Sequence, residues 1–411
     1  MKCVPFASVF LFGWCTMVSA QSQFAPVPEF PEGAPAAVQG APVADVVITI
    51  QVEVPEGTGP VFITGSDESM GPWDPARSRM MGEGTTRFIL LSLPTGSKLE
   101  YKFTLGKWDQ EALDEEGMIP GNHVLEVAKP ATVQHRITGF GNARDAALRS
   151  FKPEEVLGKL TIRRDVASQY LTEKRHVFVW TPEEYDLNPE QRFPVLYMHD
   201  AQNLFIPRMS TTGVDWGVDE TITRLAKEGK IPPMIVVGTT SSSERRMEYG
   251  VGVKADAYAR FLVEELKPVI DADYRTLADR DNTFAMGSSM GGQVSLFMLL
   301  KYPEVFSKVG CLSLHMIPFA EYNQPEVTDA FAAMPFPKSA RVYVDYGSLG
   351  WDALYLPYME KLESTFTTKG WKAEEQYTIR FFQGTNHDES AWRNRLETPF
   401  LFLFGTAEAN S

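Results

Sequence analysis

Cysteine is scarce in this 411-residue sequence, which contains only three. Two of them, Cys3 and Cys15, lie in an N-terminal segment that we expect to be removed, so Cys311 would be alone in the mature chain. One cysteine cannot form an internal disulfide bond, and the sequence has no Cys-x-x-Cys pair and no Cys/His cluster with zinc-ligand spacing. We therefore expect a fold held by packing, with no metal and no cofactor.

Long apolar runs are also missing. The chain starts MKCVPFASVFLFGWCTMVSAQ, with one basic residue, an apolar stretch of about a dozen residues and the small-residue pattern Val18-Ser19-Ala20. That stretch is shorter than the ~18 residues of a membrane helix. We interpret residues 1–20 as a signal peptide cleaved after Ala20, and we expect a secreted or periplasmic protein without a membrane anchor.

Positive charge is in deficit, with 39 Lys and Arg against 53 Asp and Glu and a net charge of −14. An acidic surface repels phosphate backbones and anionic membranes. The composition therefore argues against nucleic acid and membrane partners and favours neutral ones.

The first part of the mature chain divides by composition. Residues 21–43 carry five prolines and are typical of an extended Pro/Ala-rich linker. Residues 44–128 contain short β-type runs separated by turn residues, which predict a small all-β sandwich. These runs are Val46–Val52, Val61–Thr64, Phe88–Leu91 and Leu99–Thr104. Residues 129–154, with Pro130, Gly139 and Gly141, are interpreted as a second linker.

Residues 155–408 show a different rhythm, in which apolar strands alternate with segments of helix length. The expected strands are His176–Thr181, Phe193–Met198, Met234–Gly238, Thr283–Met286, Val309–Leu314, Arg341–Asp345 and Tyr377–Phe382. The expected helices include Lys254–Tyr274, Gly292–Tyr302 and Ala353–Lys369. Strands buried on both faces and separated by helices predict an α/β fold with a mostly parallel central sheet.

A candidate nucleophile lies in Gly287-Ser288-Ser289-Met290-Gly291, which fits G-x-S-x-G with Ser289 at the centre. Ser288 would need glycines where methionines stand. The motif follows an expected strand and precedes an apolar helix, which is the context of a nucleophile elbow. A glycine-rich turn without chemistry is the plain alternative.

A serine hydroxyl needs a neighbouring base, and in this kind of fold the chain order is Ser, then Asp or Glu, then His. Of the six histidines, only His387 lies beyond the last expected strand. His315 comes too early in the chain and is expected in the core or at the rim. His199 precedes the serine, and the other three lie outside any candidate site.

The acid has two candidates after the strand that ends near residue 345. Asp345 is still on the strand end, whereas Asp352 lies in the following loop and could reach the far nitrogen of the histidine. We favour Asp352, which would also suit a helix N-cap. The oxyanion hole needs two backbone N–H groups. We assign them to Met290 and Gln202, with Ala201 as the alternative to Gln202.

Five motifs now identify a family. "VLYMHDAQNLF", "WGVDETITRLAKEGKIPPMIVVG", "RRMEY", "GSSMGG" and "NHDESAWRNRLETPFLFLF" resemble the putative esterase family, over residues 155–406. This family comprises esterase D, feruloyl esterase and enterochelin esterase-like α/β-hydrolases. The resemblance implies an α/β-hydrolase fold with Ser289 and His387 as nucleophile and base and a match of the family's acid to Asp352. Family members often carry Asp-Gly-Gln where this chain has Asp200-Ala201-Gln202.

The N-terminal module resembles the starch-binding modules of glucoamylases over residues 45–128. The similarity rests on "VFITGSDESMGPWDP", "LEYKFTLGKWDQE" and "GNHVLEV". It implies that Trp73, Lys102 and Trp108 belong to a carbohydrate-binding site, since indole faces stack on sugar rings. The alternative is that both tryptophans fill the sandwich core.

Taken together, these features predict a secreted serine carboxylesterase that removes acetyl or hydroxycinnamoyl groups from a carbohydrate-linked ester through an acyl-enzyme. Residues 316–338, rich in Pro, Phe and Met, are expected to shape the acyl pocket. The first alternative is a siderophore-lactone esterase of the enterochelin type. An alternative of another class is a carbohydrate-binding protein with an inactive hydrolase domain.

Overall fold

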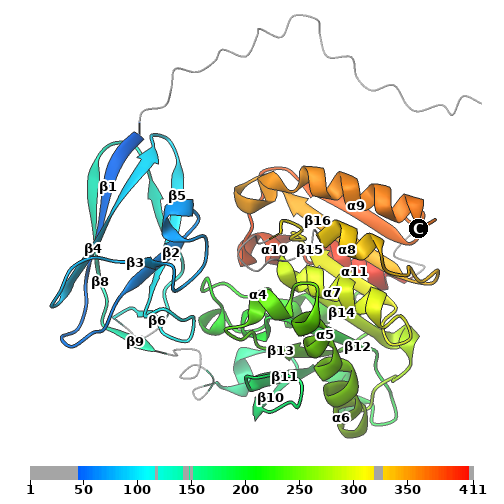
Figure 1. Ribbon diagram of the computed structural model, residues 1–411. Helices are drawn as coiled ribbons and strands as arrows, with labels where there is room; N and C mark the ends of the chain where they lie inside the picture. Colours follow the sequence, from blue (N-terminus) through cyan, green and yellow to red (C-terminus); the bar gives the residue numbers. More distant parts are fainter. Residues whose placement is uncertain (1–44, 116–118, 142–147, 149–150, 319–326, 407–411) are drawn as a thin grey trace, which may run out of the picture. The chain divides into compact units, whose positions relative to one another are not determined.

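A computed structural model of the chain describes residues 45–115, 119–141, 148, 151–318 and 327–406 (Figure 1). The expected signal peptide, the linker 21–43 and residues 319–326 of the expected pocket segment lie outside these ranges. No helix in the described ranges combines the length and the apolar character that crossing a membrane requires.

Residues 45–141 form short strands. They are β1 Asp45–Glu53, β2 Phe62–Gly65, β3 Ser78–Arg79, β4 Thr86–Pro94, β5 Lys98–Thr104, β6 Glu111–Leu113, β7 His123–Glu126, β8 Ala131–Arg136 and β9 Gly139–Gly141. One sheet has the order β4-β1-β8, and the other has the order β3-β2-β5-β6-β9 with β7 also paired to β5. Alternate residues of β1, such as Ile50 and Val52, are buried in an apolar cluster that also contains Tyr101 and Phe103 of β5. The two sheets therefore share one core, and the prediction of a β-rich N-terminal region is confirmed.

The expected end of this region at residue 128 is too early. Residues 131–136 pair with β1 as β8, and residues 139–141 pair with β6 as β9. In β8, the partly buried Val133 and His135 alternate with exposed residues, as the two-residue repeat of a strand requires. This repeat is difficult to recognise in the sequence because Pro130 and polar residues surround it. Residues 131–136 and 139–141 therefore belong to the two sheets and not to a linker.

The remaining described residues alternate between strands and helices. The strands are β10 Lys159–Val166, β11 Arg175–Thr181, β12 Val195–His199, β13 Ile235–Thr239, β14 Thr283–Ser288, β15 Lys308–Leu312, β16 Arg341–Gly347 and β17 Tyr377–Phe382. The helices are α2 Glu183–Leu187, α3 Val218–Lys227, α4 Arg245–Glu248, α5 Val253–Arg260, α6 Lys267–Asp273, α7 Met290–Lys301, α8 Val327–Ala332, α9 Leu356–Thr368, α10 Glu389–Arg395 and α11 Glu397–Phe404. The helix expected over 254–274 consists of α5 and α6 joined by a π-helical turn at Phe261–Leu266.

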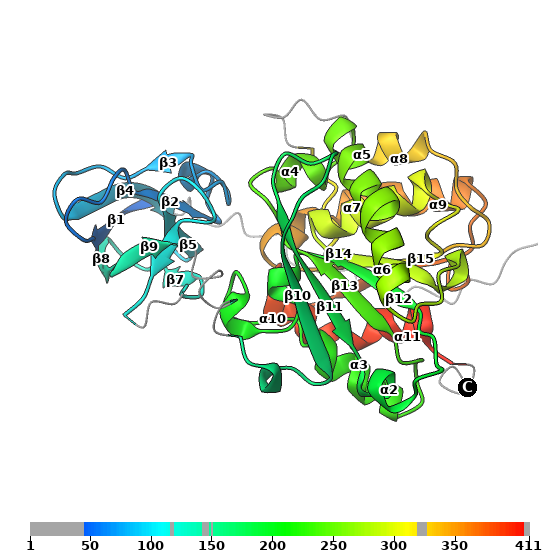
Figure 2. The ribbon, with the colours of Figure 1, turned by 90° about the horizontal axis from the view of Figure 1, so that it is seen from below.

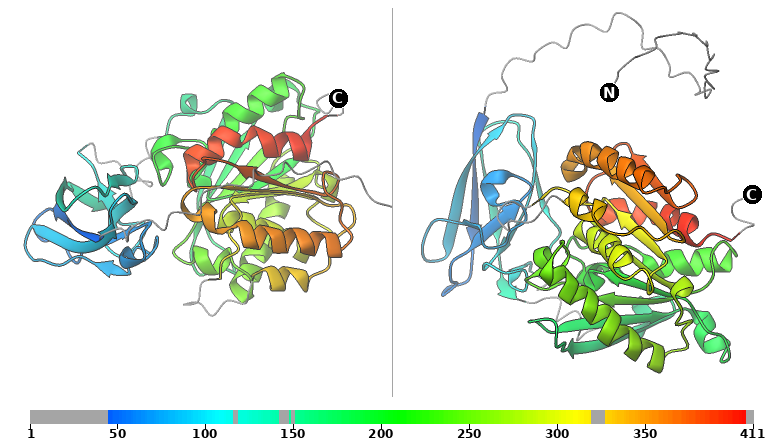
Figure 3. Two further views of the ribbon diagram at one scale, coloured as in Figure 1. Left: turned by 90° about the horizontal axis from the view of Figure 1, so that it is seen from above. Right: turned by 45° about the vertical axis from the view of Figure 1, so that its right-hand side comes forward.

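The strands β10 to β17 form one sheet with the order β10-β11-β13-β12-β14-β15-β16-β17. The pairs from β13 to β17 are parallel, whereas β11 is antiparallel to both of its neighbours. Helices α5, α6, α7 and α9 cover one face, and α3 and α11 cover the other (Figures 2 and 3). The prediction of an α/β fold is confirmed for this part of the chain.

Burial on both faces explains why the sequence of these strands is continuously apolar. Ala285 of β14 packs in the same apolar cluster as Val294 of α7. Its neighbours Phe284 and Met286 point to the opposite face and pack with Phe400 of α11. In a parallel sheet of this kind, ligands bind at the carboxyl ends of the strands, where neighbouring connections diverge. The sheet diverges in this way at β12, because the next strands in the chain, β13 and β14, lie on opposite sides of it.

Candidate active site

Ser289 occupies the sharp turn between β14 and α7. Its backbone has φ 54° and ψ −124°, a region that residues with a side chain rarely adopt. A Cβ atom at residue 287 would lie 2.6 Å from the backbone carbonyl carbon of Gly291, so the turn requires a glycine at 287. Ser289 is partly exposed whereas Ser288 is buried in the strand, and the geometry is that of the predicted nucleophile elbow.

His387 lies in the loop between β17 and α10, and its Nδ1 atom is 2.6 Å from Oδ1 of Asp352. The Asp352 side chain is fully buried, and 15 % of the His387 side chain is exposed. A carboxylate at this distance accepts the Nδ1 proton, which leaves the Nε2 lone pair for a substrate-side proton. The structure thus brings the predicted acid and base together, although they are 35 residues apart in sequence.

The other oxygen of Asp352 is also fully engaged. Oδ2 accepts hydrogen bonds from Ser313 Oγ and from the Gly347 N–H, each at 2.6 Å. Burial alone would raise the pKa of Asp352, but the hydrogen bond and charge of His387, together with these two donors, outweigh it and hold the pKa below its ordinary value. The carboxylate therefore stays ionised, with a fixed orientation toward His387.

Asp345 is held elsewhere. Its carboxylate accepts hydrogen bonds from Arg395 at 2.9 and 3.1 Å, from the Ser313 N–H at 2.7 Å and from the Tyr343 hydroxyl at 3.0 Å. It is completely buried, and burial raises its pKa. The ion pair with Arg395, which also lies 3.9 Å from Oδ2 of Asp352, ties β16 to α10.

The residues expected to form the oxyanion hole lie in the first turns of two helices. Met290 begins α7, and Gln202 is in a short 3₁₀ helix at Ala201–Asn203 after β12. N–H groups in a first turn have no partner within their own helix and are available to an anion. The preceding Asp200 adopts a left-handed backbone with φ 59°.

Ala201, where relatives often carry glycine, fits because of a compensating glycine. The backbone of Ala201 is helical, with no positive φ that would require glycine. Its methyl group is buried against Gly238 at the end of β13, where a Cβ atom would come within 2.8 Å of the Ala201 Cβ. The contact therefore has room for the alanine methyl group because residue 238 is glycine.

Three side chains that sequence reasoning gave no role hold this loop. Arg245 donates two hydrogen bonds to Asp200, at 2.8 and 2.7 Å. Asn203 donates to the buried Glu389 at 3.0 Å, which ties the loop to the segment that carries His387. Arg245 lies in the "RRMEY" motif and Glu389 in the "NHDES" motif, so both motifs pointed to them without indicating a partner.

The other histidines have separate partners. His199 and His315 are buried and bonded to the hydroxyl groups of Tyr258 and Tyr355, at 2.8 and 2.9 Å. Burial lowers the pKa of each to about 3, so both rings are neutral at ordinary pH. His135 accepts or donates a 2.8 Å hydrogen bond with a tyrosine of the N-terminal region.

The predicted carbohydrate-binding residues are not equivalent. Trp73 and Trp108 are half-buried. Lys102 is only 3 % exposed, and its ammonium donates to Glu111 at 3.0 Å and to the Pro120 carbonyl at 2.9 Å. The structure therefore leaves indole surface for a sugar, but it places Lys102 in an internal ion pair.

One cluster of carboxylates has metal-ligand spacing among the described residues. Oxygens of Asp215, Asp219 and Glu220 lie within 4.8 Å of one another. The guanidinium of Arg393 pairs with Asp215 and, at 3.1 Å, with Glu220. The arginine therefore occupies two of the three carboxylates, and the third, Asp219, accepts a hydrogen bond from the Leu157 N–H at 2.8 Å.

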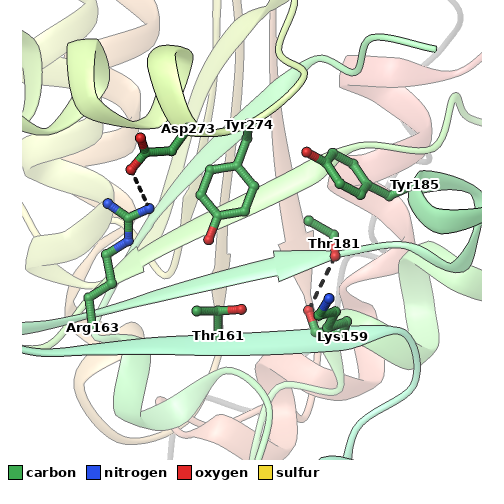
Figure 4. A pocket seen from close by; sticks show the side chains of 7 residues that line it. All are labelled: Lys159, Thr161, Arg163, Thr181, Tyr185, Asp273 and Tyr274. Carbon is green, nitrogen blue, oxygen red and sulfur yellow. Dashed lines mark hydrogen bonds and ion pairs between the residues drawn. The ribbon is translucent and has the colours of Figure 1, made fainter. Parts of the chain in front are cut away.

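A hollow of about 360 Å³ is lined by residues of β10, β11, α2 and the end of α6 (Figure 4). Thr181, which lines it, ends β11 beside the amino end of β13, whereas Ser289 follows the carboxyl end of β14. The rings of Tyr185 and Tyr274 in its wall are already covered by the guanidinium groups of Arg275 and Arg163, at 3.8 and 5.5 Å from the ring centres. Each ring thus has an arginine on one of its faces.

Comparison with known proteins identifies relatives. The family model described as "Putative esterase" matches residues 168–403. The chain is 28% identical over 228 residues to an endo-1,4-beta-xylanase/feruloyl esterase of Xylanibacter ruminicola, covering 52% of this chain and 27% of that protein. It is 27% identical over 187 residues to the ferri-bacillibactin esterase BesA of Bacillus subtilis, covering 39% of this chain and 59% of that protein.

A third relative, an alpha-amylase of Niallia circulans, is 42% identical over 74 residues, which are 17% of this chain and 6% of the amylase. Among solved structures, a ferulic acid esterase aligns with a TM-score of 0.47 and 21% identity over 60% of this chain and 98% of that one. The chain spans less than two thirds of the length of each of these three curated relatives.

Proposed function

Because the chain belongs to the "Putative esterase" family, we propose that it is a carboxylic ester hydrolase with Ser289 as nucleophile, His387 as base and Asp352 as acid. The observation that carries the proposal is the 2.6 Å contact between Asp352 and His387 at the edge of the sheet where the strained Ser289 turn lies. The family fits a serine nucleophile, and the three side chains follow the order along the chain that this chemistry uses.

The proposed reaction passes through an acyl-enzyme. Asp352 holds the proton on Nδ1 of His387, so Nε2 removes the Ser289 proton while Oγ bonds to the ester carbonyl carbon. The N–H groups of Met290 and Gln202 stabilise the resulting oxyanion. The C–O bond to the alcohol then breaks, and His387 returns its proton to the leaving oxygen. Water repeats the sequence on the Ser289 ester and releases the acid.

We propose a carbohydrate-linked acyl ester, acetyl or hydroxycinnamoyl, as the substrate of a secreted enzyme. The likeness to a xylanase/feruloyl esterase supports this choice. A siderophore lactone is the second candidate, and the likeness to a ferri-bacillibactin esterase favours it. Hydrolysis rates on acetylated xylan, a feruloylated oligosaccharide and a triscatechol lactone will separate the two, and a preference for the lactone would overturn the first.

We further propose that residues 45–141 bind glycan through Trp73 and Trp108. Lys102 of β5 would have a structural role, through its ion pair with Glu111 of β6. The likeness to an amylase is in keeping with this role. Trp73→Ala combined with Trp108→Ala should abolish sedimentation with starch or xylan, whereas Leu90→Ala, a change at an exposed apolar residue of β4, should not. Undiminished sedimentation of the double variant would assign both indoles to packing.

Replacing Ser289 by alanine tests the enzymatic assignment. Turnover of p-nitrophenyl acetate should disappear while the melting temperature is kept, since the variant removes one oxygen from a partly exposed side chain. A labelled fluorophosphonate should modify wild-type Ser289 and not the variant. If folded wild-type protein is neither labelled nor active on any of the esters, the chain is a binding protein with an inactive hydrolase fold.

A further inference from the structure

Ser313 contacts the proposed acid of the active site. It follows β15 and is completely buried, and its backbone has φ 43°, which a residue with a side chain rarely adopts. Its N–H donates to the carboxylate of Asp345 at 2.7 Å, so β16 holds the backbone at this point. Its hydroxyl oxygen lies 2.6 Å from Oδ2 of Asp352. This uncommon backbone position thus places one hydroxyl against the carboxylate that faces His387.

Two donors from α10 reach the same hydroxyl oxygen. Nε1 of Trp392 lies 2.9 Å from Ser313 Oγ, and Nη2 of Arg395 lies 2.7 Å from it. Both of these side chains are buried. An indole N–H and a guanidinium can donate hydrogen bonds but cannot accept them. The two contacts therefore engage both lone pairs of the serine oxygen.

Counting protons sets the direction of the remaining hydrogen bond. With both lone pairs engaged, Ser313 Oγ can bond to Asp352 only by donating its own proton. Oδ2 of Asp352 also accepts from the Gly347 N–H at 2.6 Å. A carboxyl proton on Oδ2 would face two donors and no acceptor at these contacts. The arrangement thus keeps Oδ2 free of a proton and leaves Oδ1 for Nδ1 of His387.

We propose that Ser313 is a positioning residue of the esterase site, which acts through Asp352, and that Trp392 and Arg395 set the direction of its hydrogen bond. The inference rests on the proposed esterase function. A hydroxyl that could rotate would at times present a lone pair to Oδ2, and the carboxylate would then turn away from His387. The two donors of α10 prevent this rotation. Because α10 begins two residues after His387, one segment carries the base and also fixes the acid.

Ser313→Ala removes the hydroxyl while the residue stays buried. We expect kcat on p-nitrophenyl acetate to fall about 10²-fold, the cost of a small misplacement in a catalytic group, with KM nearly unchanged. In proton NMR, the Nδ1 proton of His387 should lie far downfield in wild type, because a carboxylate shares it, and should move upfield in the variant. If Ser313→Ala does not fold, Ser313→Gly gives the same test, since glycine suits a φ of 43°.

Ser295→Ala is the matched control. Ser295 is equally buried, and its hydroxyl donates to the Gly291 carbonyl at 2.8 Å. This variant should keep kcat within about 3-fold of wild type and leave the NMR signal of His387 in place.

A double-mutant cycle with Trp392→Phe separates positioning from packing. Trp392→Phe removes one donor to the hydroxyl and should lower kcat about 3-fold, the worth of a single hydrogen bond. In Ser313→Ala the indole has no hydroxyl to direct. Adding Trp392→Phe there should cost no further kcat, and it should lower the melting temperature less than it does alone, since no buried N–H is then left without its acceptor.

The possible failures are distinct. Wild-type kcat in Ser313→Ala, whatever its melting temperature, would overturn the proposal and leave Ser313 a packing residue. A lower kcat with an unmoved NMR signal would also overturn it, because the contact between Asp352 and His387 would then be intact. Losses of kcat that multiply in the double variant would overturn the role of Trp392. An inactive wild type would instead refute the esterase function.

Discussion

Asp352→Asn and Asp345→Asn form a matched pair that tests which carboxylate serves His387. In Asp352→Asn, the side-chain oxygen should turn toward the two donors that Oδ2 now accepts from, Ser313 Oγ and the Gly347 N–H. The amide NH₂ then faces His387 Nδ1, which can only accept. The proton moves to Nε2, and His387 in that tautomer cannot take a proton from Ser289.

The expected cost is large for one variant and small for the other. The corresponding change in serine-protease triads costs about 10⁴ in kcat, or about 5.5 kcal/mol of transition-state stabilisation. Asp345→Asn removes the nearer counter-charge of the buried Arg395 and leaves it only the contact with Asp352 at 3.9 Å. Removing one partner of a buried pair costs about 3–5 kcal/mol of folding free energy. We expect a melting temperature lower by about 10 °C, with kcat within about 10-fold of wild type.

The assay measures kcat on p-nitrophenyl acetate together with the melting temperature of each variant. Both variants are compared at a temperature where circular dichroism shows each one to be folded. A larger loss of kcat in Asp345→Asn than in Asp352→Asn would refute the assignment and transfer the role to Asp345. Mild losses in both would indicate a Ser–His pair that works without an acid.

Three further predictions concern packing and charge. Gly287→Ala should abolish activity and lower stability because the new Cβ atom meets the Gly291 backbone. Gly291→Ala should retain activity because its Cβ atom lies at an ordinary 3.4 Å from its nearest neighbour. Equal losses of activity in the two variants would contradict this prediction. Gly238→Ala should destabilise by about 1–3 kcal/mol, and adding Ala201→Gly should restore most of that loss in a double-mutant cycle. Burial raises the pKa of Asp219 from 3.8 to about 8, so stability should fall as the pH rises through this interval. Asp219→Asn should flatten the profile of melting temperature against pH. Parallel profiles in wild type and variant would exclude this role of Asp219.

The sequence determined the elbow and the order of its partners. Gly287-Ser288-Ser289 predicts a tight strand-to-helix turn because local sterics leave only glycine at 287. Continuous apolar strands predicted a sheet covered on both faces, since each face has its own core cluster. His387 could be chosen because it is the only histidine beyond the last strand. These features are local or depend on chain order, and a single sequence contains both.

Features that depend on distant partners could not be read in this way. In the sequence, Asp345 and Asp352 are both candidate acids. In the structure, Arg395, 50 residues from Asp345, bonds to Asp345, whereas His387 bonds to Asp352. Lys102 looked like a surface ligand, but Glu111 from the neighbouring strand holds it inside. Residues 131–141 looked like a linker because their strand partners, β1 and β6, lie earlier in the chain.

Tyr355 shows the same division most clearly. In the sequence it is one aromatic residue at the start of a helix, with nothing to distinguish it from a core residue. Only the tertiary structure brings its hydroxyl to 2.9 Å from Nδ1 of His315, 40 residues earlier in the chain. Local sterics and chain order are written in neighbouring residues, whereas a hydrogen-bond partner is set by register and packing across the sheet. The sequence by itself therefore determined where we propose the chemistry, and the tertiary structure decided which side chains lie beside one another there.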